Sequence, residues 1–436
     1  MISEQNIGAS MYDFAKSLYK IPRSLTGNGN RETLARINEM LDNKLVCKEV
    51  ATGTKCFDWE IPKEWNVKSA YIITPKGEKI CDFSEHNLHL VGYSTPLNAE
   101  LTWAELAPHL HTLKEQENAI PYITSYYKEY WGFCLTHTQK EQLQKEYQDS
   151  KEKFKVVIDS ELKEGALSYG ELFIEGKNKK EIVLSTYICH PQMANNELSG
   201  IVVGTFIAKY LLSKAQDFSY RILFIPETIG SIYYLSKHLK ELKENCVAGL
   251  VLTCIGDDRA VSYLASRVGN NLADRAVLNV LKNRYPNFKQ YSYLERGSDE
   301  RQYCAVGVDL PFCTLMRSKF AEYPEYHTSL DDLSVISPKG LQGSYMLLKE
   351  ILKTITLNAV YKNTILCEPQ LGKRGLYPQL STKDTINKIK DMRNLLMYCD
   401  GKADLLEIAD ICGFALVDME EWLRKFLESG ILEKVR

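Results

Sequence analysis

A polar side chain follows each of four short apolar runs in this sequence. The four residues are His190, Glu227, Asp257 and His327. The apolar runs are typical of buried strands, and open α/β sheets bind ligands at the carboxyl ends of their strands, where the loops converge. Imidazole and carboxylate groups are ligands that Zn²⁺ takes in catalytic sites. The sequence therefore predicts a metal-assisted hydrolytic site at one edge of a sheet.

The residues around these side chains form five motifs, which are His190-Pro191, Ala194 to Gly200, Pro226-Glu227-Thr228, Gly297-Ser298-Asp299 and Tyr326-His327-Thr328. In this order they resemble the motifs of the zinc aminopeptidases with a phosphorylase/hydrolase-like fold. More narrowly, nearly the whole chain resembles the bacterial family of polysaccharide biosynthesis proteins with an aminopeptidase-like domain. The resemblance implies an α/β core with a mixed, mainly parallel sheet, an inserted small β-rich domain and a C-terminal winged helix.

The same resemblance assigns roles to individual residues. His190 and His327 match the first and last histidine ligands of the zinc aminopeptidases. Asn196 falls on the position of the aspartate that bridges two zinc ions, and Glu227 falls on the general base. We therefore expect a metal site that includes His190, Asn196, Glu227 and His327, with Glu227 as a catalytic residue.

The resemblance implies three further carboxylates at or near positions 196, 228 and 253. This sequence has Asn196, Thr228 and Thr253 there instead. Two zinc ions bring four positive charges, which a dinuclear site neutralises with carboxylates. We therefore expect one zinc ion. If Glu227 serves as a ligand, another carboxylate must act as the base; the candidates near the motifs are Asp299, Glu197, Glu300 and Asp257, and we expect Asp299 to be catalytic.

We expect a zinc-dependent, aminopeptidase-like hydrolase that acts on a peptide or small amide substrate. Two alternatives stay open. One is a degenerate hydrolase core that binds a ligand and regulates through its winged helix, and the other is an amide transfer enzyme similar to glutaminyl cyclase. Three arginines are candidate partners for a substrate carboxylate or for acidic residues of the site, or are surface charges: Arg296, Arg301 and Arg317.

Composition limits the classes of partner. A net charge of -2 gives no electrostatic reason to expect nucleic acid or a membrane surface as a partner. No apolar run approaches the roughly 18 residues that a spanning helix needs. Nothing resembles a signal peptide, and the twelve scattered cysteines suit reduced thiols. We therefore expect a cytoplasmic protein without a membrane contact, and homo-oligomer formation stays open.

Changes in the hydrophobic and polar pattern of the sequence divide the chain into four segments. We expect residues 1–60 and 136–366 to form the peptidase-like domain, 61–135 to form the inserted β-rich domain, and 367–436 to form the winged helix. The third helix of the winged domain, expected over residues 417–428, carries four acidic and two basic residues. An acidic leading turn repels phosphate groups, so nucleic acid is not the expected partner.

Overall fold

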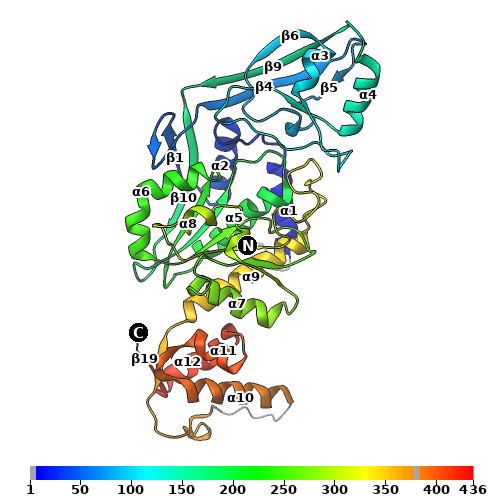
Figure 1. The fold of residues 1–436 in the computed structure, drawn as a ribbon. Helices are drawn as coiled ribbons and strands as arrows, with labels where there is room; N and C mark the ends of the chain where they lie inside the picture. The colour runs from blue at the N-terminus through cyan, green and yellow to red at the C-terminus, as the bar shows by residue number, and fades with distance from the viewer. Residues whose placement is uncertain (1–5, 377–382, 436) are drawn as a thin grey trace.

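The computed structural model describes residues 6–376 and 383–435. Figure 1 shows a central α/β core, with a smaller β-rich part at one end and a helical C-terminal part at the other. This arrangement confirms the expected fold class.

The core is built on an eight-stranded sheet with the order β1-β10-β12-β11-β13-β16-β14-β15. Its centre is parallel, because β11 pairs in parallel with both β12 and β13, and β13 pairs in parallel with β16. The outer strands β1 and β10 run antiparallel. The bounds are β1 Val46–Ala51, β10 Ala166–Ile174, β11 Glu181–Tyr187, β12 Ser219–Ile225, β13 Cys246–Leu252, β14 Ser262–Leu264, β15 Lys289–Tyr291 and β16 Phe312–Met316.

Both faces of this sheet are buried. In β11, Ile182 and Leu184 contact one hydrophobic core and Val183 contacts the other, since alternate side chains of a strand point to opposite faces. The first core packs under α1 (Ile7–Leu18), α2 (Asn28–Met40), α5 (Ser199–Leu212), α7 (Leu272–Arg284) and α9 (Pro338–Leu357). The second packs under α6 (Ile229–Asn245) and α8 (Glu300–Tyr303).

A second sheet has the order β5-β4-β9-β6 and lies at the top of Figure 1. Its strand β9 extends to Lys163, well past the expected limit at residue 135, and β10 starts three residues later in the main sheet. The small elements of this region are β2 Lys55–Cys56, β3 Trp59–Glu60, β4 Glu64–Ile73, β5 Lys79–Ile80, β6 Leu97–Thr102, α3 Trp103–Leu106, β7 Leu110–His111, β8 Phe133–Cys134, α4 His137–Tyr147 and β9 Lys153–Lys163.

The C-terminal part has the helices and strands of a winged helix. The helices are α10 Lys383–Tyr398, α11 Leu405–Cys412 and α12 Glu420–Glu428, and the strands are β17 Val360–Asn363, β18 Asp400–Asp404 and β19 Leu432–Lys434. Strand β17 pairs with both β18 and β19, so the small sheet begins before residue 367.

The winged helix docks on α7 and α9 of the core. The buried side chain of Asn279 donates to the carbonyl of Phe414 at 3.1 Å and accepts from the amide of Leu416 at 2.9 Å. Ion pairs join the same surfaces, and they are Arg275–Asp404, Arg284–Asp418 and Lys353–Glu420. The acidic leading turn of the third helix therefore faces basic side chains of the core.

Among the described residues, no helix is both long and apolar enough to cross a membrane.

Candidate functional site

The predicted site residues lie beyond the carboxyl ends of neighbouring strands. Tyr187, at the end of β11, is in register with Ile225, at the end of β12. Their following loops bring His190 and Glu227 together, with 3.9 Å between His190 Nε2 and Glu227 Oε2. The ring of His327 lies with its centroid 5.3 Å from that of His190. The structure thus gathers three residues that are far apart in the chain.

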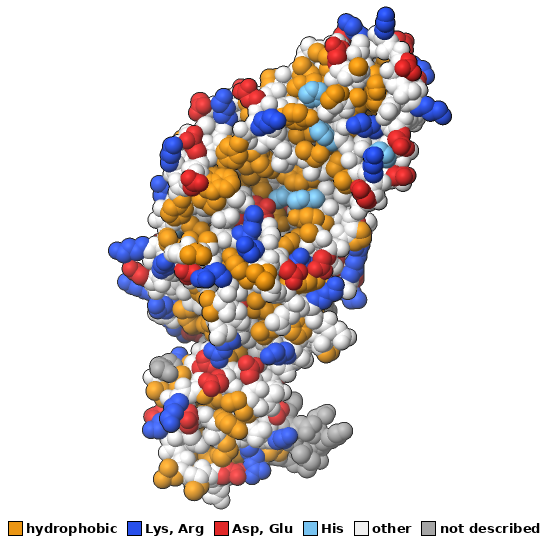
Figure 2. Space-filling view, viewed as in Figure 1, with side chains coloured by type: hydrophobic (Ala, Val, Ile, Leu, Met, Phe, Trp, Pro, Cys, Tyr) orange, Lys and Arg blue, Asp and Glu red, His pale blue; other side chains and the backbone are white. Residues whose placement is uncertain are grey.

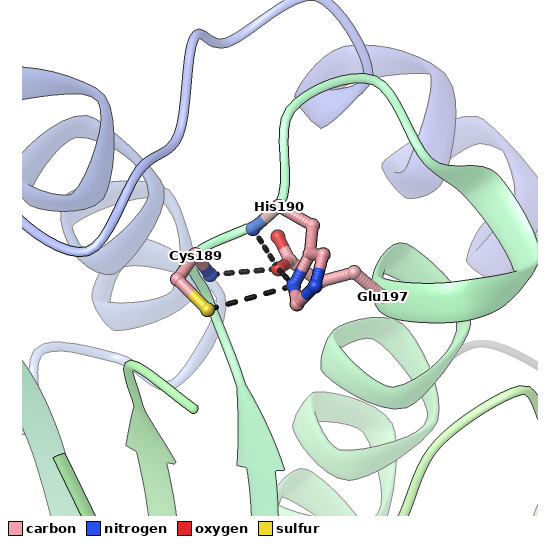
Figure 3. Close-up of side chains that lie close together, drawn as sticks. All are labelled: Cys189, His190 and Glu197. Atoms are coloured by element: carbon pink, nitrogen blue, oxygen red, sulfur yellow. Dashed lines mark hydrogen bonds and ion pairs between the residues drawn. The ribbon is translucent and has the colours of Figure 1, made fainter. Parts of the chain in front are cut away.

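Glu197 fixes the orientation of His190, as Figure 3 shows. Its Oε2 atom accepts hydrogen bonds from the amides of Cys189 and His190 and lies 3.1 Å from His190 Nδ1. Such a carboxylate favours the tautomer with the proton on Nδ1, which leaves the lone pair on Nε2. His190 Nε2, the atom near Glu227, is therefore the one available to a metal.

Arg23 neutralises Glu197 within the protein. Arg23 Nε donates to Glu197 Oε1 at 2.5 Å, and both side chains are 0% exposed. Arg23 also donates to the carbonyls of Leu18 and His190. It lies in the loop that follows α1, and its local sequence gives no signal of this role, which only the three-dimensional fold reveals.

Cys189, His190 and Glu197 form the one group of three metal-ligand side chains, within the described residues, whose ligand atoms all lie within 4.8 Å of one another. Because Glu197 already binds Arg23, it positions His190 rather than serving as a ligand. Cys189 Sγ accepts from the amide of Glu227 at 3.2 Å. The set expected from the sequence is more open than this compact group. In that set, His190 Nε2 and Glu227 Oε2 lie 3.9 Å apart, which is longer than the distance of about 3.4 Å between two ligand atoms on a tetrahedral zinc ion.

His327 is held in an unusual environment. Its backbone has a positive φ of 56°, its ring stacks on Tyr326 with centroids 3.8 Å apart, and its carbonyl accepts from the amide of Tyr122. Its Nε2 is buried without a hydrogen-bond partner. Burial, together with His190, lowers the pKa of His327 to about 3. A neutral imidazole with an unpartnered nitrogen is what a metal ligand requires.

Asn196 lies in a π-helical turn, Ala194–Leu198, that leads into α5. Its amide donates to the carboxylate of Asp331 at 2.9 Å, its side-chain Nδ2 donates to Tyr187 Oη at 3.1 Å, and its carbonyl accepts from the hydroxyl of Thr253. Its Oδ1 is buried without a partner. Asn196 therefore keeps one neutral oxygen that is free to bind a cation.

Asp299 lies beside Glu227 and is 0% exposed. Its Oδ1 accepts from the amide of Thr228 and the hydroxyl of Ser231, each at 2.8 Å, while Oδ2 has no partner. Burial and the nearby Glu227 raise the pKa of Asp299 to about 7. Burial also raises the pKa of Glu227, whose side chain is 20% exposed.

Two other candidate carboxylates already accept hydrogen bonds from the surrounding protein. Glu300 accepts from the amide of Gly297 and the hydroxyl of Thr314. Asp257 accepts from both the amide and the hydroxyl of Ser318. Neither is available as the base that the sequence left unassigned.

Several residues at or next to the site have a left-handed backbone. Positive φ angles occur at Gln192 (43°), Thr228 (64°), Cys254 (48°) and His327 (56°). Such angles are uncommon outside glycine, and a β-branched residue such as Thr228 rarely adopts them. Strained residues of this kind gather at functional sites, where the surrounding contacts hold them in place.

A cavity of about 360 Å³ opens over His190, Glu227 and His327. Its aromatic walls come from distant segments and are Trp59, Tyr122, Tyr126 and Tyr127. In Figure 2, the pale-blue histidines at the middle of the face lie beside acidic and basic side chains and a broad apolar area. The sequence alone does not predict these aromatic walls, because they come from β3 and from the inserted region, which carry none of the five motifs.

Comparison with known families supports this description. Residues 12–358 match the family described as "Domain of unknown function (DUF4910)", and residues 359–434 match the winged helix-turn-helix family.

A relative and a solved structure from one organism are similar to this chain over nearly its whole length. A candidate polysaccharide biosynthesis protein with an aminopeptidase-like domain from Clostridium acetobutylicum is 44% identical over 404 residues, which is 92% of this chain and 91% of that protein. The crystal structure of a candidate peptidase from the same organism superposes with a TM-score of 0.91, at 41% identity and 99% and 98% coverage of the two chains. The zinc aminopeptidase BSAP from Bacillus subtilis shares only the fold, with a TM-score of 0.55, 15% identity and 79% and 94% coverage. The chain therefore belongs to the family of polysaccharide biosynthesis proteins with an aminopeptidase-like domain, in which a DUF4910 domain precedes a winged helix.

Proposed function

We propose that this protein is a zinc-dependent hydrolase of a peptide or other amide bond and that it holds one zinc ion. The observation that carries the proposal is the unpartnered, buried Nε2 of His327 beside His190, whose Nε2 is left free by Glu197 and lies 3.9 Å from Glu227. Imidazole nitrogens are ligands that catalytic zinc sites take.

The charges of the site favour one ion over two. Asn196, Thr228 and Thr253 are neutral where a dinuclear site needs carboxylates. The hydroxyl of Thr228 accepts from the guanidinium of Arg301 at 2.8 Å. A fixed cation at that position opposes a second metal ion, because like charges repel strongly where water is excluded.

His190, His327 and the unpartnered oxygen of Asn196 would hold the ion, which leaves Glu227 free to act as the base. Zn²⁺ supplies Lewis-acid polarisation of the amide carbonyl when it is bound.

Glu227 is the side chain best suited to move the proton. It is partly exposed to the cavity, and its pKa is raised by burial, which brings a carboxylate nearer to neutral pH. Hydrolysis breaks the C–N bond of the amide; water adds its hydroxyl to the carbonyl carbon, and Glu227 passes the released proton to the leaving nitrogen. Asp299, which is fully buried, acts as a positioning residue through the amide of Thr228.

Hydrolysis of a panel of aminoacyl p-nitroanilides and unblocked dipeptides by the zinc-loaded full chain tests this proposal. We expect turnover that a chelator abolishes, that His327→Ala abolishes, and that His137→Ala on α4 leaves intact. Zinc binding without turnover of any substrate in the panel would contradict the proposal and favour a ligand-binding protein on a degenerate hydrolase core.

We also infer that the winged helix supports the core rather than reading DNA. The acidic leading turn of α12, which would face base edges in a DNA-reading module, is engaged by Arg284 and Lys353 of the core.

A further inference from the structure

We propose that Arg301 is the anion-recognition residue of the cavity and that the substrate is a small amide with a free carboxylate, such as a dipeptide or an N-acyl amino acid. This inference rests on the proposed function and names the substrate class of the same site.

Arg301 is held against Thr228, one of the residues that line the cavity. It lies on the short helix α8, where its Nε donates to the carbonyl of Ser298 at 3.0 Å and its Nη2 donates to Thr228 Oγ1 at 2.8 Å. Thr228 lines the cavity next to Glu227. These two hydrogen bonds fix the guanidinium beside the reacting groups.

The guanidinium retains unused hydrogen-bonding capacity. An arginine has five N–H donors, and the two hydrogen bonds above are the ones that Arg301 makes within the described chain. Among the side chains that the structure describes, no carboxylate forms an ion pair with Arg301, in contrast with the ion pair of Arg23 and Glu197. Arginine binds carboxylates through a planar fork of donors, so the free donors suit an anionic ligand group.

The other two arginines that the sequence suggested are placed elsewhere. Arg296 stacks on the ring of Tyr293 at 4.9 Å and bonds its carbonyl. Arg317 is buried and donates from Nε to the carbonyl of Asp257 at 2.7 Å. Neither Tyr293 nor Asp257 lines the cavity, whereas Thr228, which Arg301 contacts, does. The contact with Thr228 therefore distinguishes Arg301 from the other two arginines.

The neighbouring charges agree with this role. Arg301 opposes the rise in pKa that burial causes at Glu227 and Asp299. Neither carboxylate forms an ion pair with Arg301, so a substrate carboxylate can take the donors that remain free.

The size and walls of the cavity narrow the substrate further. Its volume of about 360 Å³ is near the low end of small-molecule pockets, which span roughly 300–1,000 Å³. The rings of Trp59, Tyr126 and Tyr127 offer apolar contact area for a side chain or an acyl group. An apolar dipeptide matches both the aromatic walls and the free guanidinium.

The test compares two ligands that differ only in the terminal charge. Isothermal titration uses the zinc-loaded full chain with the hydrolysis-resistant reduced-bond isostere of Leu-Phe and with the C-terminal amide of that isostere. We expect the carboxylate form to bind at least about tenfold more tightly, because a hydrogen bond to a charged group is worth that much. The ratio of the dissociation constants of the amide and carboxylate forms should fall to about 1 in Arg301→Gln and take an intermediate value in Arg301→Lys.

Arg296→Gln is the matched control, since it removes the same charge from an exposed position five residues away and should leave the ratio unchanged. Thermal melting verifies that each variant is folded. Equal binding of both ligands by the wild type, or a preference that survives in Arg301→Gln, overturns the proposal.

Hydrolysis of Leu-Phe and of its amide, followed by amine release, separates this inference from the proposed function. Preferential binding of the carboxylate isostere without hydrolysis of either substrate supports recognition by Arg301 and contradicts the hydrolase. Equal hydrolysis and equal binding of the two forms supports the hydrolase and contradicts recognition by Arg301.

Discussion

Replacement of Arg23 by methionine should lower the free energy of unfolding by about 3–5 kcal/mol, the usual cost of removing one partner of a buried ion pair. Arg23 Nε lies 2.5 Å from Glu197 Oε1, and both side chains are 0% exposed. The replacement leaves the Glu197 carboxylate buried without its cation, and it removes the hydrogen bond to the carbonyl of Leu18. Methionine fills much of the same volume, so the loss reports mainly on charge and hydrogen bonding.

Urea unfolding, followed by tryptophan fluorescence, measures this loss against a matched control. Arg36 pairs with Glu32 on α2 at 3.9 Å, and these side chains are 52% and 53% exposed. Arg36→Met should therefore cost less than about 1 kcal/mol. Equal losses in the two variants would refute the reasoning that Arg23 neutralises a buried carboxylate.

The double variant Arg23→Met with Glu197→Gln completes a thermodynamic cycle. It removes both charges, so it should recover part of the stability that Arg23→Met alone loses. A loss of unfolding free energy in the double variant that equals or exceeds the sum of the two single losses would show that the main contribution comes from packing rather than from the ion pair.

Three further predictions concern other parts of the chain. Glu197→Gln should weaken zinc binding about 10–100-fold in titration calorimetry, because this side chain orients His190. Burial lowers the pKa of His86 to about 4, below its unfolded value of about 6.5, so its contribution is complete above pH 6.5 and is lost as the pH falls toward 4. Between pH 7 and pH 5 the wild type should lose about 2 kcal/mol more stability than His86→Gln in urea unfolding, and parallel pH profiles would contradict this. Asn279→Ala should cost about 1–3 kcal/mol and speed proteolysis between the core and the winged helix, whereas an unchanged cleavage rate would argue against docking through Asn279.

Local pattern was sufficient to predict the central strands. The apolar runs that end before His190 and Glu227 are β11 and β12, because strands buried on both faces are apolar at every position. It was insufficient for β9, because the expected bounds placed this strand, together with β10, in the peptidase-like domain of residues 136–366. The two strands pair in different sheets, and alternation along a strand does not identify its partner.

The candidate site shows the same division. His190, Glu227 and His327 follow strands and carry recognisable chemistry, so their positions along the chain predicted that they would meet. Arg23 and Tyr122 touch this site from segments without a motif, and their contribution depends on long-range packing. The left-handed backbone at Thr228 was equally hidden, since threonine rarely adopts it.

The zinc content per chain tests the central claim most directly. Mass spectrometry of the intact, natively sprayed full chain, purified without chelator and equilibrated with a small excess of zinc, counts the bound ions. We predict one zinc ion per wild-type chain and per His137→Ala chain, and none in His190→Ala. Two ions in the wild type, or one ion retained in His190→Ala, would contradict a single zinc site built on His190.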